Sequence, residues 1–441
     1  MTASQEVEDR VLEEKVLGLI READLIELTS ALVAAGGENP GGTEEATVEV
    51  LANFCRGAGL EVSTDLVAPG RPNFTAVLPG QKHPDGTQKS GTQPGLLFLG
   101  HSDVVPAGSG WDRPPFEPFV RDGRLFGRGS TDMKGGLAAV LIAFQALKVA
   151  GVELPGTAAL ACTVDEEDLG IGIRAYTAAV KAAAMAASPD SPLTSATPAF
   201  PYSACVVAEP TDLETVIACR GDSYLELKVT GKSAHSGRPA DGRNAIDAAA
   251  KVLDLVRADH ARLQADADPL LGSGTWNIGL IRGGTGISMV ASECTVSLDR
   301  RLMPDEDPQR ILETLLTRIR EAGIDADGIS VEAAVTMDMP GFRTPASDPL
   351  VANAVTALAD VGVASAVSGW TAACDGGFIN REFGIPVIVM GPGGLNDQAH
   401  QVNESVSIAE LLAASRAYAL MCLRHVAPTH PAEPGWLSTA G

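Results

Sequence analysis

The stretch Leu97-Phe98-Leu99-Gly100-His101-Ser102-Asp103 gives the first indication of the fold. An uninterrupted apolar run of this kind is typical of a strand that is buried on both faces of a parallel sheet. Two polar side chains, His101 and Asp103, follow the run at once. Parallel sheets bind ligands at the carboxyl ends of their strands, so we expect both side chains to lie at a functional edge.

Four further apolar runs have the length of strands. They are Phe74 to Leu78, Thr157 to Val164, Ala204 to Ala208 and Pro386 to Met390. Helical segments separate several of these runs, and the clearest covers Met133 to Ala150. The sequence therefore predicts an α/β fold with a mostly parallel central sheet and helices on both faces.

The pattern of the chain changes near Cys219. The segments that follow are a strand at Tyr224 to Thr230, a helix at Asn244 to Ala258, strands at Trp276 to Ile281 and Thr295 to Leu302, a helix at Pro308 to Ala322 and a strand at Ile329 to Val335. This order predicts a small α+β domain with a ferredoxin-like open sheet, inserted at residues 218–337. Residues 1–217 and 338–441 then form one discontinuous domain.

The composition excludes several classes of partner. The chain has 441 residues, a net charge of -23 and 45% hydrophobic residues, which suits a globular protein with more than one domain. An acidic surface repels nucleic acid and anionic membranes, so we expect neither as a partner. No apolar stretch reaches the length that spans a membrane.

The cysteines and the N-terminal segment indicate a cytoplasmic protein. The seven cysteines are scattered, and none forms a Cys-x-x-Cys pair. This usage is typical of reduced thiols in a core. Met1 to Arg10 is acidic and polar, with no basic or apolar region of the kind found in signal peptides, so we expect no signal peptide.

Side chains that can bind metal accompany the predicted strand ends. They are Asp132 at the start of a helix, Asp165-Glu166-Glu167 and Glu209 after two strands, and His400 in a Gly-rich turn. Singly, each has an ordinary explanation, as Asp132 does in capping a helix. Gathered at one edge with His101, the carboxylates would repel one another unless a cation were bound. Histidine with carboxylate favours zinc, with cobalt or manganese as alternatives.

A series of motifs follows along the chain: Gly100-His101-Ser102-Asp103-Val104-Val105-Pro106, Gly127-Arg128-Gly129-Ser130-Thr131-Asp132-Met133-Lys134-Gly135-Gly136, Asp165-Glu166-Glu167, Glu209-Pro210, Gly231-Lys232-Ser233-Ala234-His235, Asp299-Arg300-Arg301 and Ala399-His400. In this order the motifs resemble those of the M20 metallopeptidase and deacylase family, whose fold is that of the di-zinc exopeptidases. The resemblance covers nearly the whole chain.

The resemblance implies a site for two divalent metal ions. Asp132 would bridge the two ions. His101 and Glu209 would complete one ligand set, and Glu167 and His400 the other. Asp103 would accept the second ring N–H of His101 and fix its orientation. Glu166 would act as the general base on a metal-activated water.

The resemblance also implies roles for residues of the inserted domain. His235 would stabilise the tetrahedral oxyanion, often in the catalytic site of the other subunit, which would require a homodimer and make the inserted domain a lid and dimerisation domain. Arg301 would bind a substrate carboxylate. Gly393, in the turn Gly391-Pro392-Gly393-Gly394, would offer backbone contacts to the substrate or act simply as a turn residue.

Two segments depart from the family pattern. The family has an Asn-Val-x-Pro run where this chain has Ser288-Met289-Val290-Ala291, and serine is shorter than asparagine. It often has an arginine at the end of the run that reads Asp375-Gly376-Gly377 in this chain. Both departures bear on substrate contacts, and neither touches the predicted metal ligands.

The sequence leaves several functions to be weighed. The leading hypothesis is a deacylase that hydrolyses a small N-acyl amino acid or related amide, and the second is a dipeptidase or carboxypeptidase with the same chemistry. A catalytically silent metal-binding protein is disfavoured, because a structural site does not need the additional base Glu166. A serine or cysteine hydrolase is disfavoured too, since the chain has no Gly-x-Ser-x-Gly motif and no cysteine with a histidine partner in its sequence context.

Overall fold

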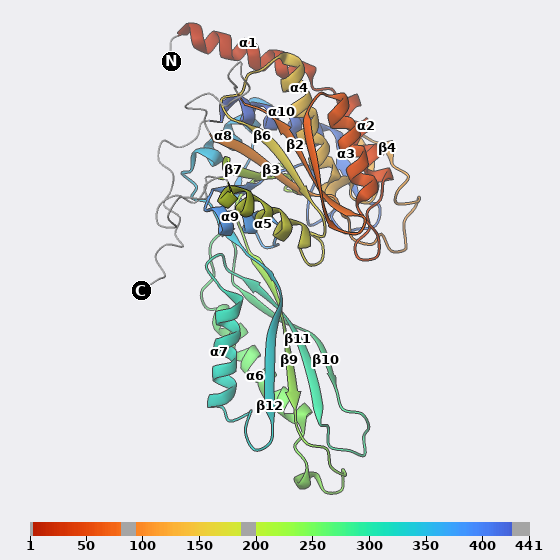
Figure 1. The fold of residues 1–441 in the computed structure, drawn as a ribbon, viewed down its shortest axis with the longest axis vertical. Helices are drawn as coiled ribbons and strands as arrows, with labels where there is room; N and C mark the ends of the chain where they lie inside the picture. Colours follow the sequence, from red (N-terminus) through yellow and green to blue (C-terminus); the bar gives the residue numbers. More distant parts are fainter. Residues whose placement is uncertain (1–2, 81–93, 187–199, 426–441) are drawn as a thin grey trace. The chain divides into compact units, whose positions relative to one another are not determined.

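The computed structural model describes residues 3–80, 94–186 and 200–425 (Figure 1). These residues form two compact units. The first comprises the chain up to Ile217, Thr344–Ser368 and the chain from Phe378 onward, and the second comprises Ala218–Arg343 and Gly369–Gly377. Each unit is built around a sheet of its own.

The central sheet of the first unit has the strand order β1-β2-β6-β3-β7-β15-β8. The bounds are β1 (Glu61–Ala68), β2 (Arg71–Leu78), β6 (Ala158–Thr163), β3 (Gly95–His101), β7 (Tyr202–Val207), β15 (Val387–Val389) and β8 (Thr215–Cys219). The middle strands β6, β3, β7 and β15 run parallel. β2, β1 and β8 join the edges in antiparallel pairings. The prediction of a mostly parallel central sheet is confirmed.

The connections around β3 place helices on both faces of this sheet (Figure 1). The chain passes from β3 through α4 (Gly135–Ala150) to β6 on one side, and then through α5 (Ile171–Ala186) to β7 on the other side. Right-handed crossovers in opposite directions put α4 and α5 on opposite faces. The other helices are α1 (Ala3–Leu19), α2 (Glu22–Ala34), α3 (Glu45–Gly57), α8 (Pro349–Asp360), α9 (Gly376–Phe383) and α10 (Ile408–Arg424).

The reversal of strand order at β3 positions the candidate site. β3 is buried along its whole length and lies between β6 and β7 in the sheet. After β3 the chain forms β6 on one side of it, and then crosses over to form β7 on the other side. At such a switch point the connections diverge from the carboxyl ends of the strands and leave a crevice where ligands bind. The predicted ligands after β3, β6 and β7 therefore converge on one edge.

Helix α4 is a helix of the protein core. The helical stretch Ser130–Ala150 is long and apolar enough to cross a membrane by length and composition, contrary to the expectation from the sequence, but 83% of its most apolar window is buried inside the protein. Its apolar character is thus explained by packing against α10, α2 and β3. Gly136 lets α4 also approach the residue after β7, since a Cβ atom at position 136 would lie 2.0 Å from the carbonyl oxygen of Ala208.

Short elements complete the first unit and its borders. A small sheet contains β16 (Ser405–Ser407), β5 (Arg124–Phe126) and β4 (Phe119–Arg121). In the sequence, β4 and β5 come shortly before Asp132, and β16 comes shortly after His400. Ser130–Lys134 forms one wide helical turn before α4. The remaining short elements are β13 (Phe342–Arg343), β14 (Val367–Trp370) and a 3-10 turn at Pro239–Asp241.

The second unit contains an antiparallel sheet of order β10-β11-β9-β12. Its elements are β9 (Gly221–Thr230), α6 (Ala245–Leu263), β10 (Thr275–Gly283), β11 (Glu293–Leu302), α7 (Pro308–Glu321) and β12 (Ser330–Met339). Side chains of β9 alternate between buried and exposed, and the buried ones pack against α6 and α7. The predicted ferredoxin-like order of strands and helices is present.

Candidate metal centre

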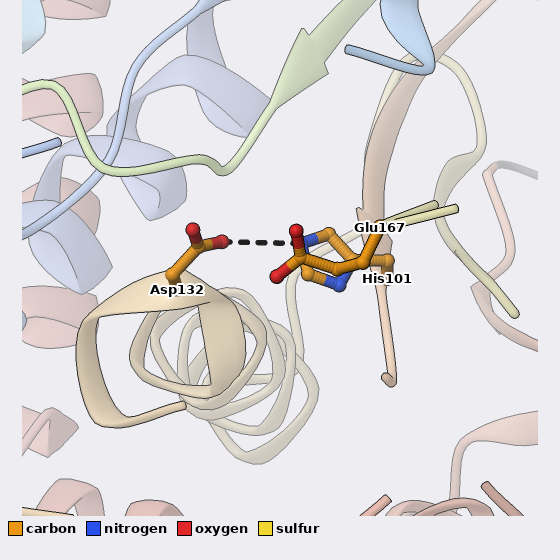
Figure 2. A group of neighbouring side chains, drawn as sticks. All are labelled: His101, Asp132 and Glu167. Atoms are coloured by element: carbon orange, nitrogen blue, oxygen red, sulfur yellow. Dashed lines mark hydrogen bonds and ion pairs between the residues drawn. The ribbon is translucent and has the colours of Figure 1, made fainter. Parts of the chain in front are cut away.

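His101 ends β3 and is almost fully buried, with 1% of its surface exposed. Its Nε2 atom lies 3.2 Å from Oδ1 of Asp132 and 3.2 Å from Oε1 of Glu209. Glu209 follows β7, and Asp132 lies in the turn before α4. Three separate segments thus bring one imidazole and two carboxylates together, and Figure 2 shows the contact between His101 and Asp132.

A second imidazole meets the other oxygen of Asp132. The Nε2 atom of His400 lies 3.4 Å from Oδ2 of Asp132 and 3.1 Å from Oε2 of Glu167. Glu167 follows β6, and its carboxylate lies beside His101 in Figure 2. Asp132 therefore presents one oxygen to each histidine, which suits a carboxylate shared between two cations.

The donor set fits divalent metal ions. Ligand atoms of His101, Asp132 and Glu167 lie within 4.8 Å of one another, and so do those of His101, Glu166 and Glu209. Oε1 of Glu167 is buried and has no hydrogen-bond partner in the part of the chain that the structure describes. A buried carboxylate oxygen without a donor is costly, and a bound cation would satisfy it.

The carboxylates make both imidazoles strongly basic. Burial alone would lower the pKa of His101, but the charge of Glu209 and hydrogen bonds to the neighbouring carboxylates hold that pKa well above its usual range. Hydrogen bonds to Asp132 and Glu167 raise the pKa of His400 to about 10. The negative charge that raises the pKa of both rings is the charge that divalent ions would neutralise.

The pKa values of the carboxylates are shifted in opposite directions. Burial raises the pKa of Glu209 to about 8, and burial together with the charge of Asp132 raises the pKa of Glu167. Burial acts on Asp132 as well, yet hydrogen bonds from both histidines keep its pKa below the usual range. Asp132 thus remains the most acidic of the three, which suits its central position.

Asp103 links His101 to both glutamates after β6. It is fully buried and accepts hydrogen bonds from the side chain of Asn39 at 2.9 Å and from the backbone N–H groups of Glu166 and Glu167 at 3.3 and 3.2 Å. Nδ1 of His101 lies 3.0 Å from the backbone oxygen of Asp103 and 3.4 Å from its Oδ1. Asp103 thus holds the glutamate segment with its carboxylate and contacts the His101 ring most closely with its backbone oxygen.

Sequence reasoning missed two buried side chains next to the site. Asn39 donates to Asp103 and, at 2.9 Å, to Asp165, while Glu404 binds the turn that contains Asp132. The only sequence signals were an asparagine in a glycine-rich loop and a glutamate four residues after His400. Neither pattern is specific, because the partners are distant in the chain.

His235 and Ser288 are neighbours within the second unit. His235 is exposed and pairs with Met289 in an isolated bridge, and the N–H of Ser236 donates to the carbonyl of Ser288 at 3.0 Å. The serine that departs from the family pattern therefore lies in the segment that supports the loop of His235.

Arg301 already has two carboxylate partners in the second unit. Its guanidinium lies 3.2 Å from Asp222 on the neighbouring strand and 3.3 Å from Asp299. Burial raises the pKa of Asp222 to about 7, against the effect of Arg301. Arg300 points to the other face, where it is buried against Glu306 and Trp276.

The two glycine positions singled out in the sequence have tight surroundings. Gly393 has φ +86°, and a Cβ atom there would lie 2.7 Å from the side chain of Thr131, the residue before Asp132. A Cβ atom at Gly377 would lie 1.7 Å from the carbonyl oxygen of Pro340. The second unit therefore has no room for an arginine at position 377 with this backbone.

Comparisons with known proteins point to one family. The family model described as peptidase family M20/M25/M40 matches residues 97–424. Succinyl-diaminopimelate desuccinylase of Aromatoleum aromaticum is 32% identical over 341 residues, which are 75% of this chain and 82% of the relative. Acetylornithine deacetylase of Proteus mirabilis is 28% identical over 372 residues, 83% of this chain and 86% of the relative. The Bacillus subtilis YXEP structure, described as a dinuclear metal binding peptidase from the M20 family, has a TM-score of 0.65 at 16% identity and covers 91% of this chain and 97% of its own.

Proposed function

The chain belongs to peptidase family M20/M25/M40 and is a metallohydrolase of amide bonds, and from that premise we propose that it deacylates a small N-acyl amino acid or a related amide. The observation that carries this proposal is the position of Asp132 between His101 and His400, with one oxygen toward each imidazole. The matched desuccinylase and deacetylase release an acyl group, which supports deacylation over peptide cleavage.

Two divalent ions, most simply zinc, fit the side chains at the centre. Asp132 would be shared, His101 and Glu209 would hold one ion, and Glu167 and His400 the other. When bound, such ions lower the pKa of a water molecule and polarise the carbonyl of an amide. Cobalt or manganese would suit the same donors.

Glu166 is the general base of the proposed mechanism. Its backbone N–H is held by Asp103, and its side chain belongs to the group with His101 and Glu209. From there the carboxylate would take a proton from the attacking water and return it to the leaving amine. Asp103 would hold the His101 ring in its orientation through this cycle.

The second unit would supply groups for the substrate. We propose that the exposed His235 stabilises the oxyanion and that it does so across a homodimer, with residues of the second unit acting as lid and dimerisation domain. Arg301, with Ser288 and Gly393 as further contacts, would bind the substrate carboxylate after exchanging one of its two present carboxylate partners. The seven buried free cysteines support a place in the cytoplasm.

A dipeptidase or carboxypeptidase is the second candidate. The chemistry at the metal centre would be the same, and the B. subtilis structure of this fold is described as a peptidase. The two candidates differ in the group on the acyl side of the bond, which is an acid such as acetate or succinate in one and an amino acid in the other.

A hydrolysis screen decides between them. The purified protein is stripped of metal and then supplied with zinc, cobalt or manganese, and each form is tested on N-acetyl, N-succinyl, N-formyl and N-carbamoyl amino acids and on dipeptides. We expect metal-dependent release of free amino acid from one acyl class. Cleavage of dipeptides alone would favour the second candidate, and full activity after exhaustive chelation would refute both.

A further inference from the structure

Both oxygens of the Glu404 carboxylate accept hydrogen bonds from one turn of the chain. Its Oε1 accepts the backbone N–H groups of Thr131 at 2.8 Å and Asp132 at 3.0 Å. Its Oε2 accepts the N–H of Gly129 at 3.0 Å and Nη1 of Arg128 at 2.7 Å. Each oxygen thus has two donors, and all four come from Arg128 to Asp132.

This contact lies in the interior. Glu404 has 1% of its surface exposed and Arg128 has 2%. Charged groups at such depth are retained when they are paired and hydrogen-bonded, and here both carboxylate oxygens of Glu404 accept from two donors each, one of them Nη1 of Arg128. Because the interior carries no competing water, three amides and a guanidinium hold the turn far more firmly than the same contacts would at a surface.

The same contact joins the two segments that carry predicted ligands. Glu404 follows His400 by four residues, and the hydroxyl of Thr131 donates to the carbonyl of Ser405 at 2.8 Å. Nη1 of Arg128 also lies 3.3 Å from the carbonyl of Gln401. Hydrogen bonds therefore join the turn of Asp132 to the segment after His400.

We propose that Glu404 is a positioning residue of the metal centre, which holds the backbone of Asp132 so that its two oxygens face His101 and His400 before any ion binds. This inference rests on the proposed function, since it concerns the same centre. Asp132 has φ -114° and ψ 95°, so its backbone leaves the helical range of the turn that contains it. The N–H of Asp132 is bound by Glu404, a residue outside that turn, and this hydrogen bond anchors the backbone of Asp132 to the segment after His400.

Glu404→Gln tests the proposal with little change in size. The glutamine amide can accept from one pair of donors, but its NH2 group then faces the other pair. We expect zinc, titrated alone into the metal-free folded protein, to bind 10- to 100-fold more weakly than to wild type, as happens when a residue that orients a metal ligand is lost. Affinity is measured by competition with a chelator of known zinc affinity, and bound zinc by elemental analysis.

Asp259→Asn is the matched control. Asp259 lies in the second unit and accepts from Trp276 at 2.8 Å, Arg262 at 2.9 Å and Arg318 at 2.9 Å, so the substitution also breaks a carboxylate network. It should lower stability and leave zinc affinity within about twofold of wild type. If Glu404→Gln is also only less stable, with wild-type zinc affinity, Glu404 has a structural role alone and the proposal is wrong.

A measurement on the wild-type protein decides the question even if Glu404→Gln does not fold. In the metal-free protein, the amides of Gly129, Thr131 and Asp132 should exchange slowly with deuterium, as hydrogen-bonded buried amides do. Rapid exchange there, with protection only after zinc is added, would overturn the proposal because the ion would then order the turn. Wild-type protein that binds no zinc at all would instead refute the proposed metal centre, while the exchange rates would still test the anchor.

Discussion

At the scale of single residues, the acidic side chains of the site differ in the groups that each of them contacts. Asp132 lies near both imidazoles, Asp103 accepts the N–H groups of Glu166 and Glu167, and Glu404 accepts the N–H of Asp132. The surroundings of these carboxylates differ because each meets different donors. In the proposed site, these surroundings would decide which carboxylate binds metal, which orients a ligand and which accepts a proton.

Glu166→Gln addresses the proposed general base. Glutamine keeps the shape of the side chain but cannot take a proton, so we expect kcat to fall by about 10²- to 10⁴-fold. Metal content, measured by elemental analysis, should stay at the wild-type level. The neighbouring change Glu167→Gln serves as the contrast, because it should release metal; near-normal turnover of Glu166→Gln would remove Glu166 from the role of base.

His425 is expected to make stability depend on pH. Burial lowers the pKa of this ring to about 4 in the folded protein, from about 6.5 in the unfolded chain. As the pH falls from about 6.5 to about 4, the unfolded chain gains a proton that the folded protein does not bind, so folding loses roughly 3 kcal/mol. Above pH 6.5 the ring is neutral in both states and the effect vanishes.

Urea unfolding of wild type and His425→Gln at several pH values measures this effect. Ser203 lies 2.9 Å from the ring, and glutamine can keep a hydrogen bond there without titrating. As the pH falls from 7 to 4.5, the unfolding free energy of wild type should decrease more than that of His425→Gln. A difference that is constant from pH 7 to pH 4.5 would contradict the assignment.

At the scale of elements, the approach of α4 to β7 sets the distance between Asp132 and Glu209. Asp132 precedes α4 by three residues, and Glu209 follows β7 by two. Gly136 allows the helix to touch the backbone of Ala208, where any larger residue would collide. Gly136 therefore affects the site indirectly, because it lets α4, and with it Asp132, lie close to the end of β7.

Gly136→Ala should separate these elements. A Cβ atom 2.0 Å from the carbonyl oxygen of Ala208 forces a shift, for which we expect a loss of about 1–3 kcal/mol of stability and weaker zinc binding. Gly18→Ala in α1 is the control, since no atom lies within 4 Å of its Cβ position and alanine favours a helix by about 0.5–1 kcal/mol. Thermal unfolding and zinc titration measure both; equal behaviour of the two variants would show that the contact does not matter.

At the scale of the whole molecule, the proposed reaction needs residues from both compact units. The proposed metal ligands belong to the first unit, while His235 and Arg301 belong to the second. We expect His235→Ala to lower kcat without a loss of metal, because the ring is proposed to contact the oxyanion and no ligand. Steady-state kinetics and elemental analysis of the variant test this.

Mixed dimers distinguish action within a subunit from action across the dimer. When His235→Ala and Glu166→Gln subunits are combined, one complete site forms per mixed dimer only if His235 serves the partner. Recovery of activity above that of either variant alone supports the exchange. Absence of recovery, with mixed dimers verified by affinity tags on each subunit, would place His235 in its own subunit's site or outside catalysis.

The sequence alone located most strands of the central sheet and the residues that the structure gathers at the centre. Apolar runs and helical segments arise from local patterns, so β2, β3, β6, β7 and β15 could be located before the structure was known. β1 and β8 were missed. β1 is largely exposed and has no apolar run to reveal it.

Only the tertiary structure decided which polar groups hold the site in place. Asn39, Asp103 and Asp165 meet although Asn39 is 64 and 126 residues away from the other two, and Glu404 meets Asp132 across 272 residues. The pairing of Arg301 with Asp222 and Asp299 was likewise not predicted from the sequence. A motif records local spacing, whereas the hydrogen bonds of a buried carboxylate depend on which distant backbone groups the folded core brings within 3 Å of it.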